Sequence, residues 1–495
     1  MKRYIHILLL VCGSLFLGSC DSWLDVQPYD KIGEEDLFSS EEGFQRLLNG
    51  VYVELNDDNL YGSSLTVELI EVMGGAYQIG SDRNQWEDYV DLANYTYNTT
   101  YWKDRFDQVW DKAYALVMNC NKILDNIENR KNLFSETNYD IIRGEALALR
   151  AMLQFDMLRI FGPVYSRNPE NISIPYYEHQ TTDIADRLPA SQVLEKVIAD
   201  LIEAEKLLVN DPIITQGTMM TPAEGNESTF LRYRALRLNY YAVQGLLARV
   251  YLYAGNKTSA FDYATKVIQA AETGVFPFVD PADVVGNPTN IDRIFSSEVL
   301  FALTNVNRVN LFKNYHDPNR YPDRIFTMEP TLLDELIYAP ELNFGGSKND
   351  YRYIANWKMP NISSVTNKCF YKYDDMPDNS VIENTMIPML RLGEMYLIAA
   401  ESQSDELGAG LSYVNELRSH RGLTGSELDR LTNNRLAFEY IRELYGEGQL
   451  FFFYKRTYST IYSYSDYEQG VALGTPASDA VFVVPIPDTE MNNRQ

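Results

Sequence analysis

Residues 244–268 read QGLLARVYLYAGNKTSAFDYATKVI and predict two helices joined by a short turn. The first helix is expected over residues 237–253, the turn over 254–256, and the second helix over 259–271. Gly and Asn are favoured where a chain leaves a helix, and apolar residues at three- and four-residue spacing mark a helix face that packs against a neighbour. The segment therefore predicts an antiparallel helical hairpin.

The same pattern occurs twice more along the chain. Apolar residues at helical spacing predict a helix from about 102 to 127, followed by a second over 139–161, and a third pair is expected over 390–401 and 407–420. These pairs look like tetratricopeptide repeats, whose hairpins stack their apolar faces into one continuous core. The predicted fold class is mainly α: one large domain of helical-hairpin repeats with long irregular, loop-rich insertions and a few short strands.

Two stretches between the helices lose this regularity. Residues 56–100 are rich in Gly, Asn, Asp, Tyr and Trp, and residues 272–385 are mixed and loop-rich. Long ordered loops in a compact domain are usually functional. The tail VFVVPIP (481–487) is expected to form a short apolar strand or an extended segment that its prolines stop.

The chain begins with a pattern typical of an exported lipoprotein. Lys2 and Arg3 precede a short apolar stretch, and Leu-Gly-Ser then leads into Cys20. The stretch is shorter than the ~20 residues that a spanning helix needs, and a basic start with small residues before the cut describes a secretory signal peptide. Leu-Gly-Ser-Cys resembles the bacterial lipobox, which predicts a lipoprotein signal peptide over 1–19 and a lipid on Cys20. An ordinary secretory signal with a chance cysteine is the alternative.

The balance of charge excludes some partners. The chain has 69 Asp and Glu against 43 Lys and Arg, a formal net charge of −26. Nucleic-acid binding depends on basic patches that release counterions, so we expect none. The same charge argues against the folded body lying on an anionic lipid surface, and no later segment is a convincing membrane helix. The membrane link is therefore expected to be the covalent lipid alone.

The cysteines do not form a disulfide framework. After the signal peptide only Cys20, Cys120 and Cys369 remain, and two thiols beside a lipidated one are too few to staple a chain of this length. Cys120 lies in an apolar helical pattern and is expected to be a buried small hydrophobe. A bridge between Cys120 and Cys369 stays open as the alternative.

Short segments in order along the chain resemble the SusD/RagB-type nutrient-binding lipoproteins of Bacteroidetes. They are CDSWLDVQP (20–28), FSSEEGFQRLLNGVY (38–52), NCNKILDNI (119–127) with GEALALRAMLQFDMLRIFGPV (144–164), IPMLRLGEMYLIAAES (387–402), NELRSHRGL (415–423), RELYGEGQLFFFYKR (442–456) and PIPDTE (485–490). Gln449-Leu450 stands where an Arg is common in the family, and Phe453 where an Asp often lies. These departures resemble one subgroup of the family and weaken any transfer of a substrate from better-known members.

The resemblance implies a cell-surface binding protein of the outer membrane, not an enzyme. Such proteins capture oligosaccharides, or in some members peptides, and act with a SusC-like TonB-dependent transporter. The implied layout is a lipidated tether (20–37) followed by a single SusD-like domain (38–495). Its helical scaffold spans about 102–271 and 387–456 and docks on the transporter. The ligand binds on the opposite side, in loops of about 56–101 and 300–385.

A sugar site needs aromatic faces that stack on a pyranose and planar polar side chains that bond its hydroxyls. Both loop regions contain such side chains, and each of them alone has a packing role as its alternative. The predicted ligand-binding residues are Tyr77, Asn84, Trp86, Tyr89, Tyr315, Tyr321, Arg324 and Trp357.

Catalytic and metal-binding motifs are missing from the sequence. The four histidines are scattered, and there is no His-Glu-x-x-His, no Gly-x-Ser-x-Gly, no phosphate-binding glycine loop and no Asp-x-Asp-x-Asp-Gly calcium loop. No metal, no cofactor and no catalytic residue is therefore predicted, and a structural Ca²⁺ has no motif to support it. A surface glycan hydrolase, which needs only two facing carboxylates, stays open as an alternative, as does a pure scaffold protein.

Several charged residues are expected to serve the scaffold. Arg391 and Glu394 are predicted to pair at i,i+3 within one helix. Glu401, Arg418 and Arg421 are expected to be scaffold polar groups with no ligand role.

Overall fold

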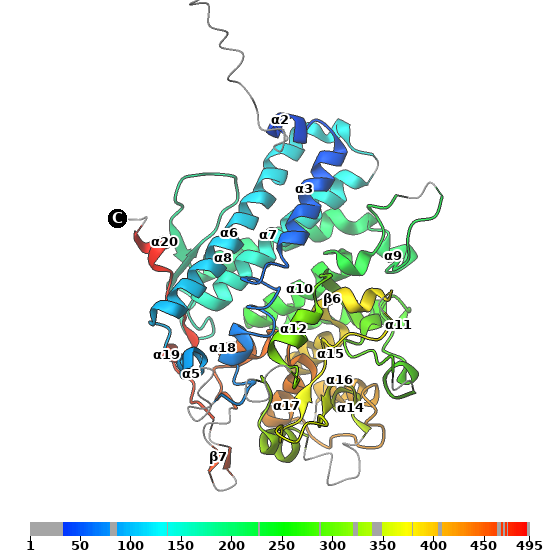
Figure 1. Ribbon diagram of the computed structural model, residues 1–495. Helices are drawn as coiled ribbons and strands as arrows, with labels where there is room; N and C mark the ends of the chain where they lie inside the picture. Colours follow the sequence, from blue (N-terminus) through cyan, green and yellow to red (C-terminus); the bar gives the residue numbers. More distant parts are fainter. Residues whose placement is uncertain are drawn as a thin grey trace, which may run out of the picture.

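The computed structural model is mainly helical (Figure 1). It describes residues 33–79, 87–135, 137–225, 228–286, 289–319, 325–338, 349–378, 380–403, 408–462, 467–468, 471–472 and 474–492. In Figure 1 the long helices lie together in the upper half, and the later helices lie below them among irregular segments. Within the described residues, no helix combines the length and hydropathy needed to cross a membrane.

Four long helices form the upper half: α3 (Glu41–Glu54), α6 (Thr100–Ile127), α7 (Asn138–Phe161) and α8 (Ala190–Leu207). Helix α7 packs against both α6 and α8 and is buried along almost its whole length. Small residues make this close packing feasible: a Cβ atom on Gly144 would lie 2.9 Å from Leu208 Cγ. The hairpin predicted over 102–161 is confirmed.

The two later hairpins are also confirmed. They are α10 (Tyr240–Tyr253) with α11 (Lys257–Glu272), and α15 (Leu392–Ser402) with α16 (Ala409–Ser419). Asn239 and Asn256 cap α10 and α11, because their side-chain oxygens accept the backbone N–H groups of Ala242 and Ser259. The Asn239 cap is why α10 begins three residues later than the sequence pattern suggested.

The strands are short and form four two-stranded antiparallel sheets within the described residues: β1 (Ile172–Pro175) with β2 (Arg187–Pro189), β3 (Val299–Thr304) with β6 (Met386–Arg391), β4 (Trp357–Lys358) with β5 (Cys369–Phe370), and β7 (Tyr467–Glu468) with β8 (Val471–Ala472). The β3–β6 pair leads directly into α15. Helices α17 (Asn433–Leu444) and α18 (Leu450–Thr457) complete the lower half.

The remaining elements are short. They are α2 (Glu34–Leu37), α4 (Leu69–Met73), α5 (Glu87–Ala93), α9 (Ile213–Gln216), α12 (Val309–Tyr315), α14 (Tyr351–Asn356), α19 (Asp479–Phe482) and α20 (Asp488–Asn492), with 3-10 or π-helical turns at Glu128–Leu133, Leu208–Asn210, Arg234–Leu236, Ala282–Gly286, Ser296–Glu298, Leu332–Ile337 and Ile382–Thr385.

Two local predictions differ from the structure. Residues 60–76, expected in a long loop region, are almost all buried and include α4, because apolar side chains there join the core. The tail over 481–487 forms no strand: Ser478 caps the short helix α19, and the chain extends only after Phe482.

The two described cysteines are unpaired. Cys120 is buried in α6, as the apolar pattern predicted. Cys369 is also buried, and both thiols are free, so the alternative of a bridge between them is excluded.

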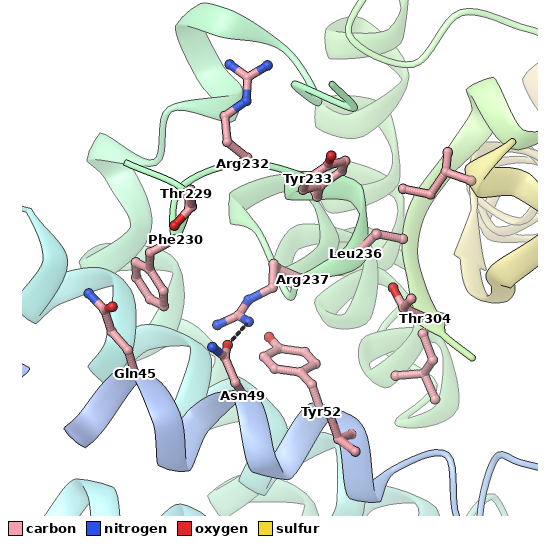
Figure 2. Close-up of a pocket in the computed structure, with 13 residues that line it drawn as sticks. Gln45, Asn49, Tyr52, Thr229, Phe230, Arg232, Tyr233, Leu236, Arg237 and Thr304 are labelled. Atoms are coloured by element: carbon pink, nitrogen blue, oxygen red, sulfur yellow. Dashed lines mark hydrogen bonds between the residues drawn. The ribbon is translucent and has the colours of Figure 1, made fainter. Parts of the chain in front are cut away.

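An open cavity of about 470 Å³ remains between α3 and the segment 229–237 (Figure 2). Residues 229–237 precede α10 and form the wall of the cavity that faces α3. The end of β3 and Ile382 close the cavity at its edge.

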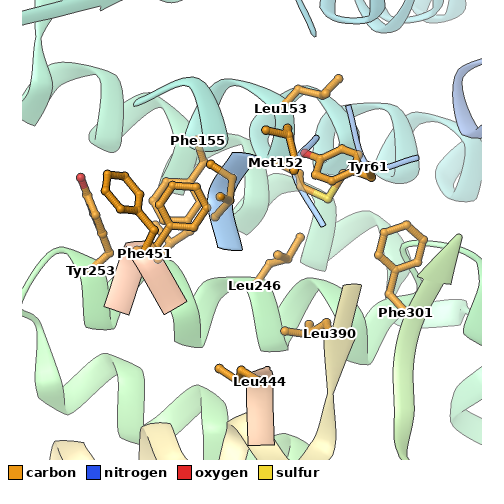
Figure 3. Close-up of a cluster of buried hydrophobic side chains, with 14 of the residues drawn as sticks. Tyr61, Met152, Leu153, Phe155, Leu246, Tyr253, Phe301, Leu390, Leu444 and Phe451 are labelled. Carbon is orange, nitrogen blue, oxygen red and sulfur yellow. The ribbon is translucent and has the colours of Figure 1, made fainter. Parts of the chain in front are cut away.

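The core is one continuous cluster of apolar side chains (Figure 3). Figure 3 draws some of its members, among them Phe155 of α7, Leu246 of α10, Phe301 of β3, Leu444 of α17 and Phe451 of α18. Each is at most 3% exposed, and burying a side chain of this size contributes about 1.5–3 kcal/mol. The helical scaffold and the irregular half therefore share a core and form one packing unit.

A turn that follows α17 connects this core to α4. The carboxylate of Glu71 accepts the backbone N–H groups of Gly446 (3.2 Å) and Gly448 (2.8 Å). Gly448 has a φ of +67°, and a Cβ atom there would lie 1.9 Å from the backbone oxygen of Leu65. Only glycine fits at this position.

Charged side chains form a buried charge network in the lower half. Its members are Glu298, Asp350, Arg352, Lys372, Arg391, Arg418, Arg421, Glu439, Arg442, Glu443 and Glu447. Glu443 of α17 accepts from Arg391 (2.8 Å) and Arg421 (2.6 Å). One turn earlier, Glu439 accepts from Arg418 (2.7 Å). The scaffold role expected for Arg418 and Arg421 agrees with these contacts.

The predicted pair of Arg391 with Glu394 was wrong. Arg391 ends strand β6 and bonds Glu443 and Glu447 instead, while Glu394 pairs with Arg249 of α10 at 2.6 Å. The i,i+3 rule applies only within a helix, and the helix begins one residue after Arg391.

The charge network predicts a specific acid sensitivity. Burial alone would raise the pKa of Glu439, but the guanidinium groups of Arg442, Arg352 and Arg418 lower it from 4.5 to about 2. Because the folded-state pKa is depressed, the resulting stability is present above pH ~4.5 and is lost as the pH falls towards 2, a contribution of about 3 kcal/mol. Denaturant unfolding between pH 6 and 2 should therefore show a shallower pH slope for Glu439→Gln than for the parent.

Glu195→Gln, an exposed carboxylate on α8, is the matched control and should keep the parent slope. Equal slopes for Glu439→Gln and the parent would contradict the prediction.

The turn after α17 gives a second prediction. Gly448→Ala combines left-handed strain, worth about 1–2 kcal/mol, with a backbone clash, so the free energy of unfolding should fall by clearly more than 2 kcal/mol. Gly425 has a similar φ of +81°, and a Cβ atom added there would have nothing within 4 Å. Gly425→Ala should therefore show the strain alone, and a similar loss in both variants would refute the role of the clash.

Candidate functional site

Four predicted ligand residues lie in one group of aromatic rings. Phe326 is its centre: Tyr77 stacks on it with ring centroids 4.6 Å apart, Tyr315 lies at 5.6 Å, and Tyr89 meets it edge-on at 5.1 Å. Tyr77 precedes α5, Tyr89 lies in it, and Tyr315 ends α12. The two loop regions that the sequence singled out therefore meet in space.

Trp357, at the start of β4, joins the same group through Tyr445. The Trp357 and Tyr445 rings are 5.0 Å apart, and Tyr445 meets Tyr77 edge-on at 5.9 Å. His316 lies between Tyr77 and Phe370 and is fully buried. Burial lowers the pKa of His316 to about 4, so the ring is neutral and donates from Nδ1 to the Phe326 carbonyl at 2.8 Å. We call the following group of rings the aromatic base: Tyr77, Tyr89, Tyr315, His316, Phe326, Trp357, Phe370 and Tyr445.

Most of the aromatic base is closed to solvent. Tyr77, Tyr89 and Trp357 are 5%, 8% and 6% exposed, and only Tyr315 is partly exposed. The Tyr77 hydroxyl donates to the Val67 carbonyl (2.7 Å), and the Tyr89 hydroxyl donates to Glu68 (2.5 Å). These rings are packed as core side chains in the structure, and their role in ligand binding stays a prediction. Asn84, Trp86, Tyr321 and Arg324 lie outside the described residues.

Three chain segments meet beside the aromatic base. The Gln78 N–H donates to the Thr327 carbonyl at 2.8 Å, and the Asn367 amide donates to Gln78 Oε1 at 2.7 Å. These contacts hold residues 78–79, 325–327 and 367–368 side by side, and we call this group the ligand edge; Gln78, Ile79 and Lys368 are its partly exposed members. Gln78 and Asn367 were not among the predicted residues, since only the fold brings a polar residue of one loop next to that of another.

Charged groups flank this edge. Arg105 of α6 donates to Glu68 (2.8 Å) and to Ser64 (2.9 Å). The Tyr353 hydroxyl donates to Asp334 at 2.7 Å, and Lys368 pairs with the same carboxylate. These contacts fix planar and charged side chains beside partly exposed rings, which is the mixture that a hydroxyl-rich ligand requires.

The described residues hold no cluster of potential metal ligands: they include no group of three or more His, Cys, Asp or Glu side chains placed to hold a metal ion. Glu71 is a buried carboxyl whose pKa burial raises to about 8. A shifted pKa is typical of catalytic acids, but Glu71 is fully enclosed and bonded to the turn after α17. Glu71 therefore has a structural role: it holds this turn against α4.

Models of known protein families match most of the chain. A family model described as starch-binding and associating with the outer membrane matches residues 22–221, and the SusD family model matches residues 283–495. The curated SusD-like protein P38 of Formosa agariphila is 24% identical, over 86% of this chain and 83% of its own length.

Solved structures have the same fold. A putative sugar binding protein from Bacteroides vulgatus superposes with a TM-score of 0.67 at 20% identity, covering 92% of this chain and 96% of its own. A laminarin binding SusD-like protein superposes with a TM-score of 0.55 at 16% identity, over 84% and 91%. Two family models that together span most of the described sequence, and the shared mainly helical fold, show that this chain belongs to the SusD/RagB family of carbohydrate-binding proteins associated with the outer membrane.

Proposed function

We propose that this protein captures oligosaccharides at the cell surface and delivers them to a SusC-like TonB-dependent transporter. The observation that carries the proposal is the convergence of residues 78–79, 325–327 and 367–368 beside the aromatic base. The two predicted ligand loops, about 56–101 and 300–385, would then present aromatic and amide side chains to the same ligand. The family and the laminarin binding neighbour support a glycan as that ligand.

Rigidity of the aromatic base supports a binding role. Rings that interlock at 4.6–5.9 Å and hydroxyls bonded to the backbone leave little freedom beside the ligand edge. A ligand that meets a fixed surface loses less free energy to ordering of the protein than one that must organise mobile loops.

Attachment to the membrane is proposed to rest on the lipid at Cys20. The net charge of −26 opposes contact between the folded body and an anionic bilayer. The chain between Cys20 and α2 would act as a tether, and the helical hairpins α10–α11 and α15–α16 would face the transporter. The ligand would then bind on the side opposite to the docking side.

The ligand assignment can be tested with the soluble form, residues 21–495. Titration calorimetry with laminarin and starch oligosaccharides should give saturable binding without turnover. Trp86→Ala and Tyr315→Ala should each weaken binding at least tenfold, about 1.4 kcal/mol, because stacking area is lost. Tyr139→Ala, a partly buried tyrosine on α7, is the control.

Saturable binding of peptides with none of glycans would replace the glycan by a peptide ligand. Release of shortened product, abolished by one carboxylate substitution, would make the protein a hydrolase. If Trp86→Ala and Tyr315→Ala both leave the affinity unchanged, the ligand edge is not the binding site.

The location can be tested in cells. The parent should be found in the outer-membrane fraction and should be cleaved when intact cells are treated with protease. Cys20→Ala should leave that fraction, since a covalent lipid supplies the attachment. A parent chain that is protected from protease on intact cells would contradict surface exposure.

A further inference from the structure

The cavity between α3 and residues 229–237 shares no residue with the aromatic base. One wall is a single face of α3, where Gln45, Asn49 and Tyr52 follow one another at helical spacing. The opposite wall is residues 229–237, with the end of β3 between them (Figure 2). Its volume of about 470 Å³ is within the range of small-molecule sites.

Arg237 forms a fixed polar centre in this cavity. Its Nε donates to Glu145 at 2.9 Å, and its Nη1 donates to Asn49 Oδ1 at 2.5 Å. The guanidinium lies 4.2 Å above the Tyr52 ring and 5.2 Å from the Phe230 ring. Glu145 is fully buried and neutralises much of the added charge. Arg232 also lines the cavity, and its Nε donates to the Thr221 carbonyl at 2.9 Å. The cavity is thus polar, and the charge of Arg237 is offset by Glu145.

The bond from Arg237 also sets the direction of the Asn49 amide. Because Oδ1 accepts from Arg237, the Nδ2 group is left for another partner, and Figure 2 shows Asn49 reaching up between the two walls. Among the described residues, Asn49 Nδ2 and the hydroxyls of Thr229, Tyr233 and Thr304 make no hydrogen bond to protein. They are therefore open to water or to a ligand.

Aromatic and apolar side chains supply the rest of the surface. Phe230 and Tyr233 are partly exposed, and Leu236 and Leu303, the latter in strand β3, also line the cavity. Tyr233 has a φ of +54°, a left-handed conformation that costs about 1–2 kcal/mol for a residue with a Cβ. Its backbone N–H is held by the Met219 carbonyl at 3.1 Å. Strain of this kind persists only where the surroundings enforce it.

We propose that this cavity is a second sugar-binding site, distinct from the ligand edge, that takes one or two pyranose rings of a neutral glycan. Amide and hydroxyl groups from both walls would bond the sugar hydroxyls, and the Phe230 and Tyr233 rings would face its apolar C–H groups. This inference takes from the proposed function only the class of ligand, a glycan. A second site on one chain would retain a long glycan more strongly than either site alone.

The test uses methyl-labelled residues 21–495 and five probes: the methyl pyranosides of glucose, galactose, mannose, xylose and N-acetylglucosamine. Leu236, Leu303, Ile382 and Val53 line the cavity, so at least one probe should shift their methyl resonances in the unmodified chain. Asn49→Ala and Phe230→Ala should each weaken that binding at least fivefold. Arg46→Ala, on the solvent side of the same helix, and Trp86→Ala, in the ligand loops, should leave it unchanged.

If none of the five probes shifts these methyl groups, the second site is refuted, whatever oligosaccharides the chain binds elsewhere. The same holds if the affinity survives both cavity variants but is lost in Trp86→Ala. Failure of calorimetry with laminarin and starch oligosaccharides, together with methyl shifts in the cavity, would instead reject the ligand edge and keep the second site.

Discussion

The lower half of the molecule depends on two carboxylates of α17. Glu439 and Glu443 lie one helical turn apart and receive guanidinium groups from α14, from the end of β6, from α16 and from Arg421, which follows α16. Removing these charges from water is costly unless each one is paired with good geometry. The energetic requirement is therefore also a positional one, because each segment that contributes an arginine must reach α17 in one register.

This constraint explains how irregular segments are held without long sheets. The strands in the described residues pair only two at a time, so backbone ladders cannot order the lower half. Buried ion pairs and interlocked aromatic rings do so instead. The turn after α17 then links the network to α4 through Glu71, and α4 leads the chain towards the ligand edge.

Features that depend on local spacing could be predicted from the sequence. The helical hairpins follow from apolar residues three and four apart and from the caps at Asn239 and Asn256. Features that depend on partners far along the chain could not. Arg391 looked like a helix residue with a neighbour three positions on, yet its partners lie more than fifty residues away. The burial of residues 60–76 likewise depends on neighbours that sequence spacing does not reveal.

The candidate site was also predictable only in part. Sequence composition picked out residues that lie together, since Tyr77, Tyr89, Tyr315 and Trp357 meet around Phe326 and Tyr445, and their ligand role stays a prediction. It could not show that most of these rings are buried, because aromatic residues serve both cores and binding surfaces. The cavity beside α3 was missed altogether. Its walls combine one helix face, a loop and a strand end, and no pattern in any single segment marks it.

The two free cysteines have a practical consequence. Cys120 and Cys369 are both buried, and burial raises the pKa of each thiol to about 12, so neither forms much of the thiolate that reacts with maleimides near neutral pH. In the form that starts after Cys20, these are the two native thiols. One cysteine introduced at Val306, which is 81% exposed, would therefore accept a single fluorophore. Capture of a glycan and encounter with a transporter could then be followed by fluorescence on a chain with its native core intact.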